Sequence, residues 1–269
     1  MANPLKLPGK FFEGLGRRTI AGLDEMGYAA AIFFEAIYWT LTGWRYRQPV
    51  RVTSAFAAMM QFGVTALPIA TLLAATIGLM LAIQSLYSLG LFGAEQYAYI
   101  GIALSVVREF SPMIMGILIA GRSGSAIAAR LATMSINQEV DALQVMGINP
   151  VRFLVSPTLI ALVLMMPCLA MWANLVSILS AGLYVSAQLH QSFGAYLNDT
   201  ITVLKTGDVW HGLGKATLFG IIIALVGVVN GSMVQGGAEG VGKVTTRSVV
   251  ISITLIVVAD MIFAYMTTK

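Results

Sequence analysis

Charge is what this chain has least of. Only 10% of its 269 residues are charged, whereas 58% are hydrophobic and the mean hydropathy is +0.83. A soluble domain carries about 25% charged residues, so this composition excludes an ordinary soluble fold. It indicates a membrane protein.

Cysteine and histidine are also scarce. The chain has one cysteine, Cys168, which excludes an internal disulfide framework and a cysteine-based zinc site. Cys168 lies in an apolar run, where we expect a small buried side chain. The two histidines, His190 and His211, lack metal-ligand spacing with each other or with carboxylates, and we expect both in an outside loop. We therefore expect no catalytic residue, no metal site and no enzymatic activity in this chain.

Long apolar runs, by contrast, are abundant. Each is close to or longer than the about 20 residues that a helix needs to cross a bilayer. Their hydrophobicity is continuous rather than alternating, which favours helices over a β-barrel. We predict an all-α membrane protein with five transmembrane helices over residues 62–86, 98–121, 153–179, 216–234 and 249–266.

The basic residues set the expected orientation. Twelve of the sixteen Lys and Arg residues fall in the N-terminal segment, in 122–152 and in 236–247, and three fall on the opposite side. The positive-inside rule then places the N-terminus in the cytoplasm and the C-terminus outside. The early basic residues are typical of an edge facing anionic lipid, and no basic patch interleaved with aromatics predicts nucleic-acid binding.

Residues 28–44 are aromatic-rich and largely apolar, with Glu35 as the one charge. Basic residues flank this stretch on both sides, so crossing would leave one basic cluster outside. We therefore predict an interfacial helix rather than a sixth span. The chain is expected to form one domain, with 1–55 as the cytoplasmic or interfacial segment and 56–269 as the five-span bundle.

Arg108 and Glu109 stand side by side in the second apolar run. A charge at that depth costs at least ~2.5–3.5 kcal/mol and usually faces a cavity, a partner or a transport path. Consecutive residues point about 100° apart on a helix, so each needs another partner, for which Asp260 or a second copy of the chain are candidates. Pro112 lacks the N–H that would bond the Arg108 carbonyl, and we expect the helix to weaken or bend there.

The segment between the second and third runs predicts a short cytoplasmic helix of about three turns. Ser135 and Gln138 fit a capping box, and Gly147 followed by Pro150 fits a helix end. The helix either rests on the membrane surface or docks into a groove on a soluble partner. Its expected apolar face consists of Ile136, Val140, Leu143 and Gly147. Glu139 and Asp141 lie near the positive end of its helix dipole.

Two glycine-rich stretches have simpler interpretations than their motifs suggest. Residues 237–243 resemble a nucleotide-binding P-loop, but Val244 occupies the place of the required Ser or Thr and no strand precedes it. We expect a cytoplasmic turn and no ATP bound by this chain. The small residues of 121–125, and Gly227 with Gly231, are expected to let helices approach closely.

Several motifs together resemble the MlaE/YrbE permease family, over nearly the whole chain after residue 20. They are Val-Arg-Glu-Phe-Ser-Pro at 107–112, Ala-Gly-Arg-Ser-Gly-Ser-Ala at 120–126, Glu-Val-Asp-Ala-Leu at 139–143, Met-Gly-Ile-Asn-Pro at 146–150 and Thr-Thr-Arg at 245–247. The resemblance implies the homodimeric permease of an inner-membrane ABC transporter, with an interfacial helix, five spans and a periplasmic C-terminus. Such a permease moves phospholipid or related lipid, a role tied to outer-membrane lipid asymmetry.

The resemblance also implies partners and sites. A cytoplasmic ATPase dimer would hold ATP and magnesium, and an MCE-domain protein would bind substrate on the outer side. The lipid pathway would include Arg108, Glu109 and Pro112, with Leu81, Leu89 and Phe92 as apolar lining. The coupling helix would be 136–147, including Met146.

Two hypotheses compete with this interpretation. An ion-coupled secondary transporter would use Glu109 and Asp260 as proton-carrying groups, although no internal repeat supports it. A scaffold that only anchors partners would leave the charges inside the membrane unexplained. Arg108 and Glu109 could also form a structural ion network between subunits without touching lipid.

Overall fold

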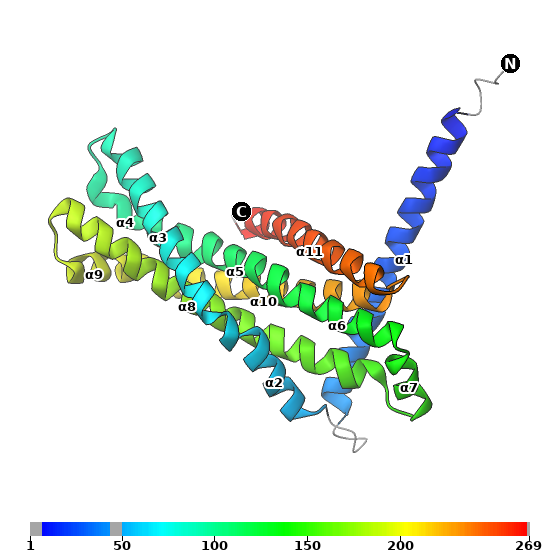
Figure 1. Ribbon diagram of the computed structural model, residues 1–269. Helices are drawn as coiled ribbons and strands as arrows, with labels where there is room; N and C mark the ends of the chain where they lie inside the picture. The colour runs from blue at the N-terminus through cyan, green and yellow to red at the C-terminus, as the bar shows by residue number, and fades with distance from the viewer. Residues whose placement is uncertain (1–6, 44–49, 268–269) are drawn as a thin grey trace.

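The computed structural model describes residues 7–43 and 50–267, and this part of the chain is helical and contains no strand. Five helical segments are long and apolar enough to cross a membrane (Figure 1). They are Val52–Gly90, Glu95–Ile136, Val151–Leu189, Thr206–Ser232 and Ala238–Thr267. The predicted all-α membrane fold with five spans is confirmed. Trp44, at the end of the predicted interfacial helix, and the early basic residues Lys6, Arg45 and Arg47 lie outside the described residues.

Three of the five spans combine shorter helical segments end to end. The first contains α2 (Val52–Phe62), a 3₁₀ turn (Val64–Ala66) and α3 (Leu67–Gly90). The second contains α4 (Ala98–Ser105), α5 (Ser111–Ile119) and α6 (Ser125–Ile136), separated by two π-helical turns, η4 (Val106–Phe110) and η5 (Ala120–Gly124). The third contains a π turn, η6 (Val151–Val155), and α8 (Ser156–Leu189). The fourth and fifth spans are the single helices α10 (Thr206–Ser232) and α11 (Ala238–Thr267). Two short helices, α7 (Glu139–Val145) and α9 (Phe193–Val203), lie in the connections.

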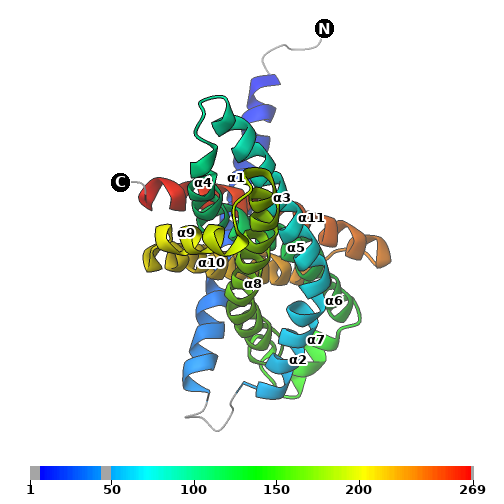
Figure 2. The ribbon, with the colours of Figure 1, turned by 90° about the vertical axis from the view of Figure 1, so that its left-hand side faces the viewer.

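Helix α1 (Leu7–Thr42) is much longer than the predicted 28–44 and is not among the five candidate spans. It crosses the bundle helices steeply instead of running alongside them (Figures 1 and 2). Arg247 at the start of α11 donates to Glu25 of α1 at 2.6 Å, and Asn149 donates to Glu35 at 2.7 Å. These bonds fix α1 to one end of the bundle, an arrangement that fits an interfacial helix.

Small residues let the first and third spans approach closely. Ala70, Ala74, Gly78 and Ala82 recur every four residues on α3 and are buried. A Cβ on Gly78 would lie 2.2 Å from the carbonyl oxygen of Ser177, so a side chain there has no room. The spacing is the small-xxx-small pattern that membrane helices use in place of a hydrophobic driving force.

Helices α6 and α10 pack in the same way. A Cβ on Gly227 would lie 3.1 Å from Ile127, and one on Gly231 would lie 2.8 Å from Leu131. A Cβ on Gly124 would lie 3.3 Å from the side chain of Ile223 in α10. The expected close approach at these glycines is confirmed. The turn precedes the P-loop-like stretch, at Gly236 with φ +76°, and residues 238–243 form the first turns of α11, which corrects the expected turn over 237–243.

The predicted helix between the second and third spans is wrong at its start. Ser135 and Ile136 belong to the last turn of α6, and α7 begins only at Glu139. Gln138 adopts a left-handed conformation with φ 58° and makes no side-chain cap, so the predicted capping box does not form. Helix α6 continues through Ile136, so the chain turns at 137–138 and α7 can begin only after that turn.

The end of α7 is as predicted. Gly147 has φ +73°, its N–H bonds the Gln144 carbonyl, and the N–H of Ile148 bonds the Leu143 carbonyl. This pair of bonds is a Schellman motif, which satisfies carbonyls that the helix end would leave free. The resulting helix has seven residues, about two turns, instead of the predicted three.

Cys168 is exposed, which corrects the expectation of a buried side chain. It lies on α8 among other exposed apolar residues, Leu164, Met171, Trp172 and Leu175. An apolar side chain in a membrane span can face lipid as favourably as it faces protein. Hydrophobicity therefore does not decide which face of α8 is buried.

Candidate functional site

The π turn η4 carries the two charges of the second span. The N–H of Ser111 bonds the Val106 carbonyl, one residue farther back than in an α-helix, and Pro112 has no N–H to give. These two shifts leave the carbonyl of Val107 without its usual partners in the helix. The predicted weak point at Pro112 is thus a π bulge, which sets Arg108 and Glu109 apart from the regular ladder.

Helix α10 packs directly on this bulge. A Cβ on Gly212 would lie 2.2 Å from the Val107 carbonyl oxygen and 3.5 Å from Pro112. Only a glycine lets the two backbones approach so closely. The contact brings His211 and Lys215, on either side of Gly212 in α10, against Glu109.

Lys215 lies at the centre of the site. Its ammonium bonds Glu109 Oε2 and lies 3.0 Å from Asp260 Oδ1, and its side chain is fully buried. It therefore joins the second, fourth and fifth spans through one cation. Removing an ammonium from water costs on the order of several kcal/mol unless nearby carboxylates compensate its charge. Two carboxylates surround it here.

Arg108 points to a different partner. Its guanidinium lies 3.6 Å from Asp208 Oδ1 near the start of α10, and its side chain is 34% exposed. His211 Nε2 lies 3.9 Å from Glu109 Oε1, and its ring packs edge-on against Phe263 of α11. The expectation that neighbouring Arg108 and Glu109 do not neutralise each other is confirmed. Asp260 reaches Glu109 only through Lys215.

The arrangement is a charged cluster inside an apolar bundle. Arg108 and Glu109 are each about one-third exposed, whereas Lys215, Asp260, Asp208 and His211 are buried or nearly so. The buried members stabilise one another, and the two exposed ones can contact a polar group brought to the cluster. It contains two cations and three carboxylates and provides both donors and acceptors.

Comparison with known proteins identifies the family. The model of the permease family MlaE matches residues 55–266, which covers the five spans except for a few terminal residues and includes every member of the cluster. The chain belongs to the MlaE permease family. It is a membrane permease subunit of the ABC transporter type.

Relatives agree with this assignment. A probable ABC transporter permease protein of Rickettsia typhi is 33% identical over 91% of this chain and 93% of its own length. A protein of the same description from Synechocystis is 33% identical over 77% of this chain and 79% of its own length. The Arabidopsis thaliana chloroplast protein Trigalactosyldiacylglycerol 1 is 36% identical over 61% of this chain and 47% of its own length. The family membership favours the ABC interpretation over an ion-coupled transporter.

Three members of the cluster in this MlaE-family chain were not predicted as site residues. The predicted fourth span starts at 216 and so leaves out Lys215 and Asp208, and His211 is expected in an outside loop. All three lie in α10, which begins at Thr206, ten residues before the predicted 216. One signal was available: Glu109 and Asp260 both lie inside apolar runs, so a buried cation had to balance them.

The predicted apolar lining lies near one end of the bundle. Leu81 and Leu89 pack against a second core cluster that contains Ala98, Ile102 and Val106, and Phe92 is exposed. The structure therefore does not bring these three residues into one pocket with Arg108 and Glu109. An open apolar groove of about 660 Å³ lies elsewhere between α3 and α5; Ile69, Leu73, Ile77, Ile114, Ile117, Leu118, Gly121 and Arg122 line it.

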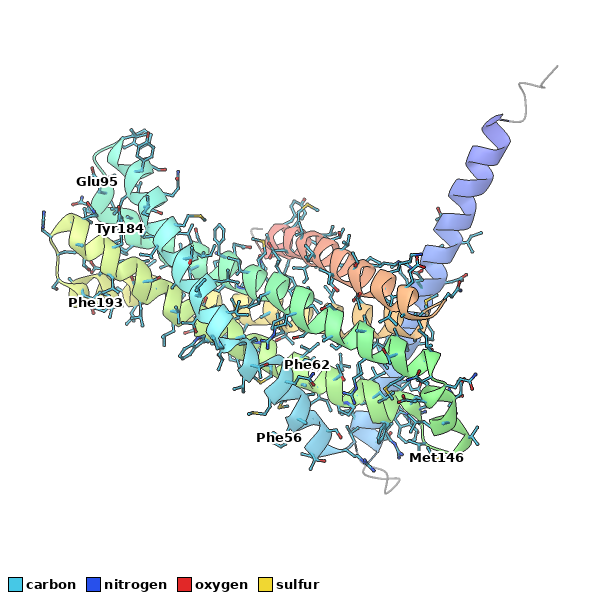
Figure 3. All side chains as sticks on the ribbon, viewed as in Figure 1. Phe56, Phe62, Glu95, Met146, Tyr184 and Phe193 are labelled. Carbon is cyan, nitrogen blue, oxygen red and sulfur yellow. The ribbon has the colours of Figure 1, made fainter. Side chains whose placement is uncertain are left out.

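The predicted coupling residues are at the opposite end of this permease. Figure 3 shows Met146 at one end of the bundle and Glu95 and Phe193 at the other. Met146 is 65% exposed and Val145 is 90% exposed, although both are apolar. Glu139 and Asp141 are exposed, Val140 is half-buried and Leu143 is buried. Two exposed apolar side chains at the tip of a short helix are typical of a docking surface.

Proposed function

We propose that this chain moves phospholipid or a related lipid across or out of a membrane. The observation that carries the proposal is the pair Arg108 and Glu109, whose side chains are each about one-third exposed. The pair lies on the same span that forms one wall of the apolar α3–α5 groove. Ile117, which lines the groove, follows Glu109 by eight residues, roughly 12 Å along the helix axis. A charged headgroup fits the first feature and acyl chains fit the second.

The name of one relative supports a lipid substrate. The Arabidopsis protein is named after trigalactosyldiacylglycerol, a lipid with two acyl chains. The charged cluster also argues against a merely structural anchor, because charges inside a membrane are retained mostly where they serve a route or a partner. Arg108 would bind the headgroup and Lys215 would hold Glu109 in place.

The proposed assembly has three kinds of partner. The tip of α7 would dock on a cytoplasmic ATPase dimer, which binds ATP and magnesium and drives the motion. An MCE-domain protein would exchange lipid on the outer side, and a second copy of this chain would complete the pathway. In the proposed orientation, which follows the positive-inside bias, the N-terminus would lie in the cytoplasm and the C-terminus in the periplasm, with the chain in a bacterial inner membrane.

Removing the exposed cation tests the substrate. Arg108→Ala, purified with its ATPase and placed in vesicles, is expected to lower ATP-dependent transfer of fluorescent phospholipid by about 10- to 100-fold, the cost of one charge-assisted hydrogen bond. Lys243→Ala removes a cation from an exposed pair with Glu239 and serves as the control. Full transfer by a folded Arg108→Ala variant would contradict the proposal.

A charge at the tip of α7 tests the ATPase partner. Val145→Asp with Met146→Asp places two carboxylates where a docking surface would exclude water, and we expect about tenfold or greater loss of copurifying ATPase. Leu91→Asp is the matched control, because Leu91 is 70% exposed at the opposite end of the bundle. Equal recovery of the ATPase with both variants would show that α7 is not the docking site.

A further inference from the structure

A separate pocket lies at the cytoplasmic end of the bundle, between α2, α6 and the start of the third span. Its volume is about 250 Å³. Arg130, which lines it, comes 22 residues after Arg108 on the same continuous span, or roughly 30 Å along the helix axis. The pocket is therefore distinct from the charged cluster. Its lining comprises Ser54, Ala57, Ala58, Gln61, Phe62, Ala126, Ile127, Arg130, Leu131, Phe153, Leu154, Pro157 and Thr158.

Three hydrogen-bond donors from two helices meet at this pocket. They are the hydroxyl of Ser54 and the amide of Gln61 on α2, and the guanidinium of Arg130 on α6. Within the described residues, none of these side chains has a hydrogen bond or an ion pair. The fourth polar side chain, Thr158, already donates to the Leu154 carbonyl at 2.8 Å. The pocket thus offers unused donors to an acceptor from outside.

The charge of the pocket is of one sign. None of its lining residues is acidic. A second guanidinium, that of Arg51, lies 5.0 Å from the centre of the Phe153 ring, which forms part of the wall. Ser54 lies in the first turn of α2, where the helix dipole is positive. These three contributions favour an anion.

The rest of the wall is apolar and continues onto the outer surface of the helix. Phe62, Ile127 and Leu154 line the pocket, and Val64, one turn after Gln61 on the first span, is 39% exposed. In a span, such side chains face lipid tails. A ligand of this site therefore joins a negative charge to a hydrocarbon chain.

We propose that this pocket binds the phosphate headgroup of an anionic phospholipid from the cytoplasmic leaflet. Arg130 pairs with the phosphate, Ser54 and Gln61 donate to its oxygens, and the acyl chains leave the pocket past Val64, along the lipid-facing side of the first span. Basic pockets between membrane helices on this side of a bilayer are suited to such headgroups. The bound lipid joins α2 to α6, the helix that leads into α7. The site exists whether or not the chain transports lipid.

The test measures lipid binding to the full chain, purified in mild detergent and stripped of lipid, by native mass spectrometry. The probe is dioctanoyl phosphatidylglycerol, with dioctanoyl phosphatidylcholine and glycerol 3-phosphate as comparisons. Arg130→Gln is expected to weaken phosphatidylglycerol binding about tenfold, by loss of a charge-assisted hydrogen bond. Ala57→Phe fills the pocket from an exposed position, leaves the donors intact and is expected to weaken binding as well.

Two further variants separate this site from other causes. Lys243→Gln removes an equal charge elsewhere on the cytoplasmic side and is expected to keep the binding. Arg108→Ala disrupts the charged cluster and is expected to remove only the lipid bound there, so that the part of the binding that depends on Arg130 remains. Binding that is lost in Arg108→Ala but retained in Arg130→Gln and Ala57→Phe would overturn the proposal. Equal binding of phosphatidylcholine would overturn the preference for an anionic lipid, and equal binding of glycerol 3-phosphate would show that the ligand is a soluble phosphate ester.

Discussion

Lys215→Met is expected to lower the free energy of unfolding by about 3–5 kcal/mol, because it leaves Glu109 and Asp260 as uncompensated neighbours inside the bundle. Methionine keeps the length of the lysine side chain, so the loss measures charge and not packing. Within the described residues, the fully buried Lys215 is the cation that pairs with both carboxylates. The measurement is the midpoint of thermal unfolding in detergent, which should fall by roughly 10 °C.

Lys243→Met is the matched control for this experiment. Lys243 also pairs with a carboxylate, Glu239 at 2.7 Å, but both side chains are more than 70% exposed. Such a surface pair contributes about 0–1 kcal/mol. Similar midpoints for the two variants would show that the buried cluster does not stabilise the bundle.

Neutralising the carboxylates should restore stability without restoring transport. Lys215→Met combined with Glu109→Gln and Asp260→Asn has no uncompensated charge and keeps the side-chain volumes nearly constant. Replacing a buried ion network by neutral groups of similar shape is often close to neutral for stability. A triple variant that unfolds as early as Lys215→Met would mean that lost packing, not charge, explains the first result.

The sequence predicts the spans well because hydrophobicity over a long run is a local property. It predicts the ends of the spans poorly, because a helix can continue past its apolar part. Lys215 lies nine residues inside α10, about 14 Å from its start, yet Asp208 and His211 make this stretch polar enough to be assigned to a loop. The charged cluster is therefore only half visible in the sequence.

The difference between local and non-local determinants also explains two wrong predictions, the start of α7 and the burial of Cys168. Gly147 and Pro150 determine the end of α7 locally, so that end is predicted correctly. Its start depends on whether α6 stops before Ser135, and the two residues of a capping box occur too often to decide it. Cys168 is exposed because a membrane helix has two apolar environments, protein and lipid, and its composition does not distinguish them.

Gly212 is the second position where we expect a large effect. Gly212→Ala would place its Cβ 2.2 Å from the Val107 carbonyl oxygen, a backbone atom that cannot rotate away. Such overpacking costs about 1–3 kcal/mol or forces the helices apart. Since Val107 belongs to the π turn that carries Arg108 and Glu109, separation of the helices would also draw Lys215 away from Glu109. We expect a lower unfolding midpoint together with reduced lipid transfer.

Gly207→Ala tests whether this effect arises from the contact rather than from the loss of a glycine. Gly207 lies in the same helix, and a Cβ there would meet no atom within 4 Å. Alanine in an open helical position is more favourable than glycine by up to about 1 kcal/mol, so this variant should be as stable as the parent chain or more so. If both alanine variants behave alike, α10 does not press on the bulge. The geometry of the charged cluster would then have to be held by its ion pairs alone.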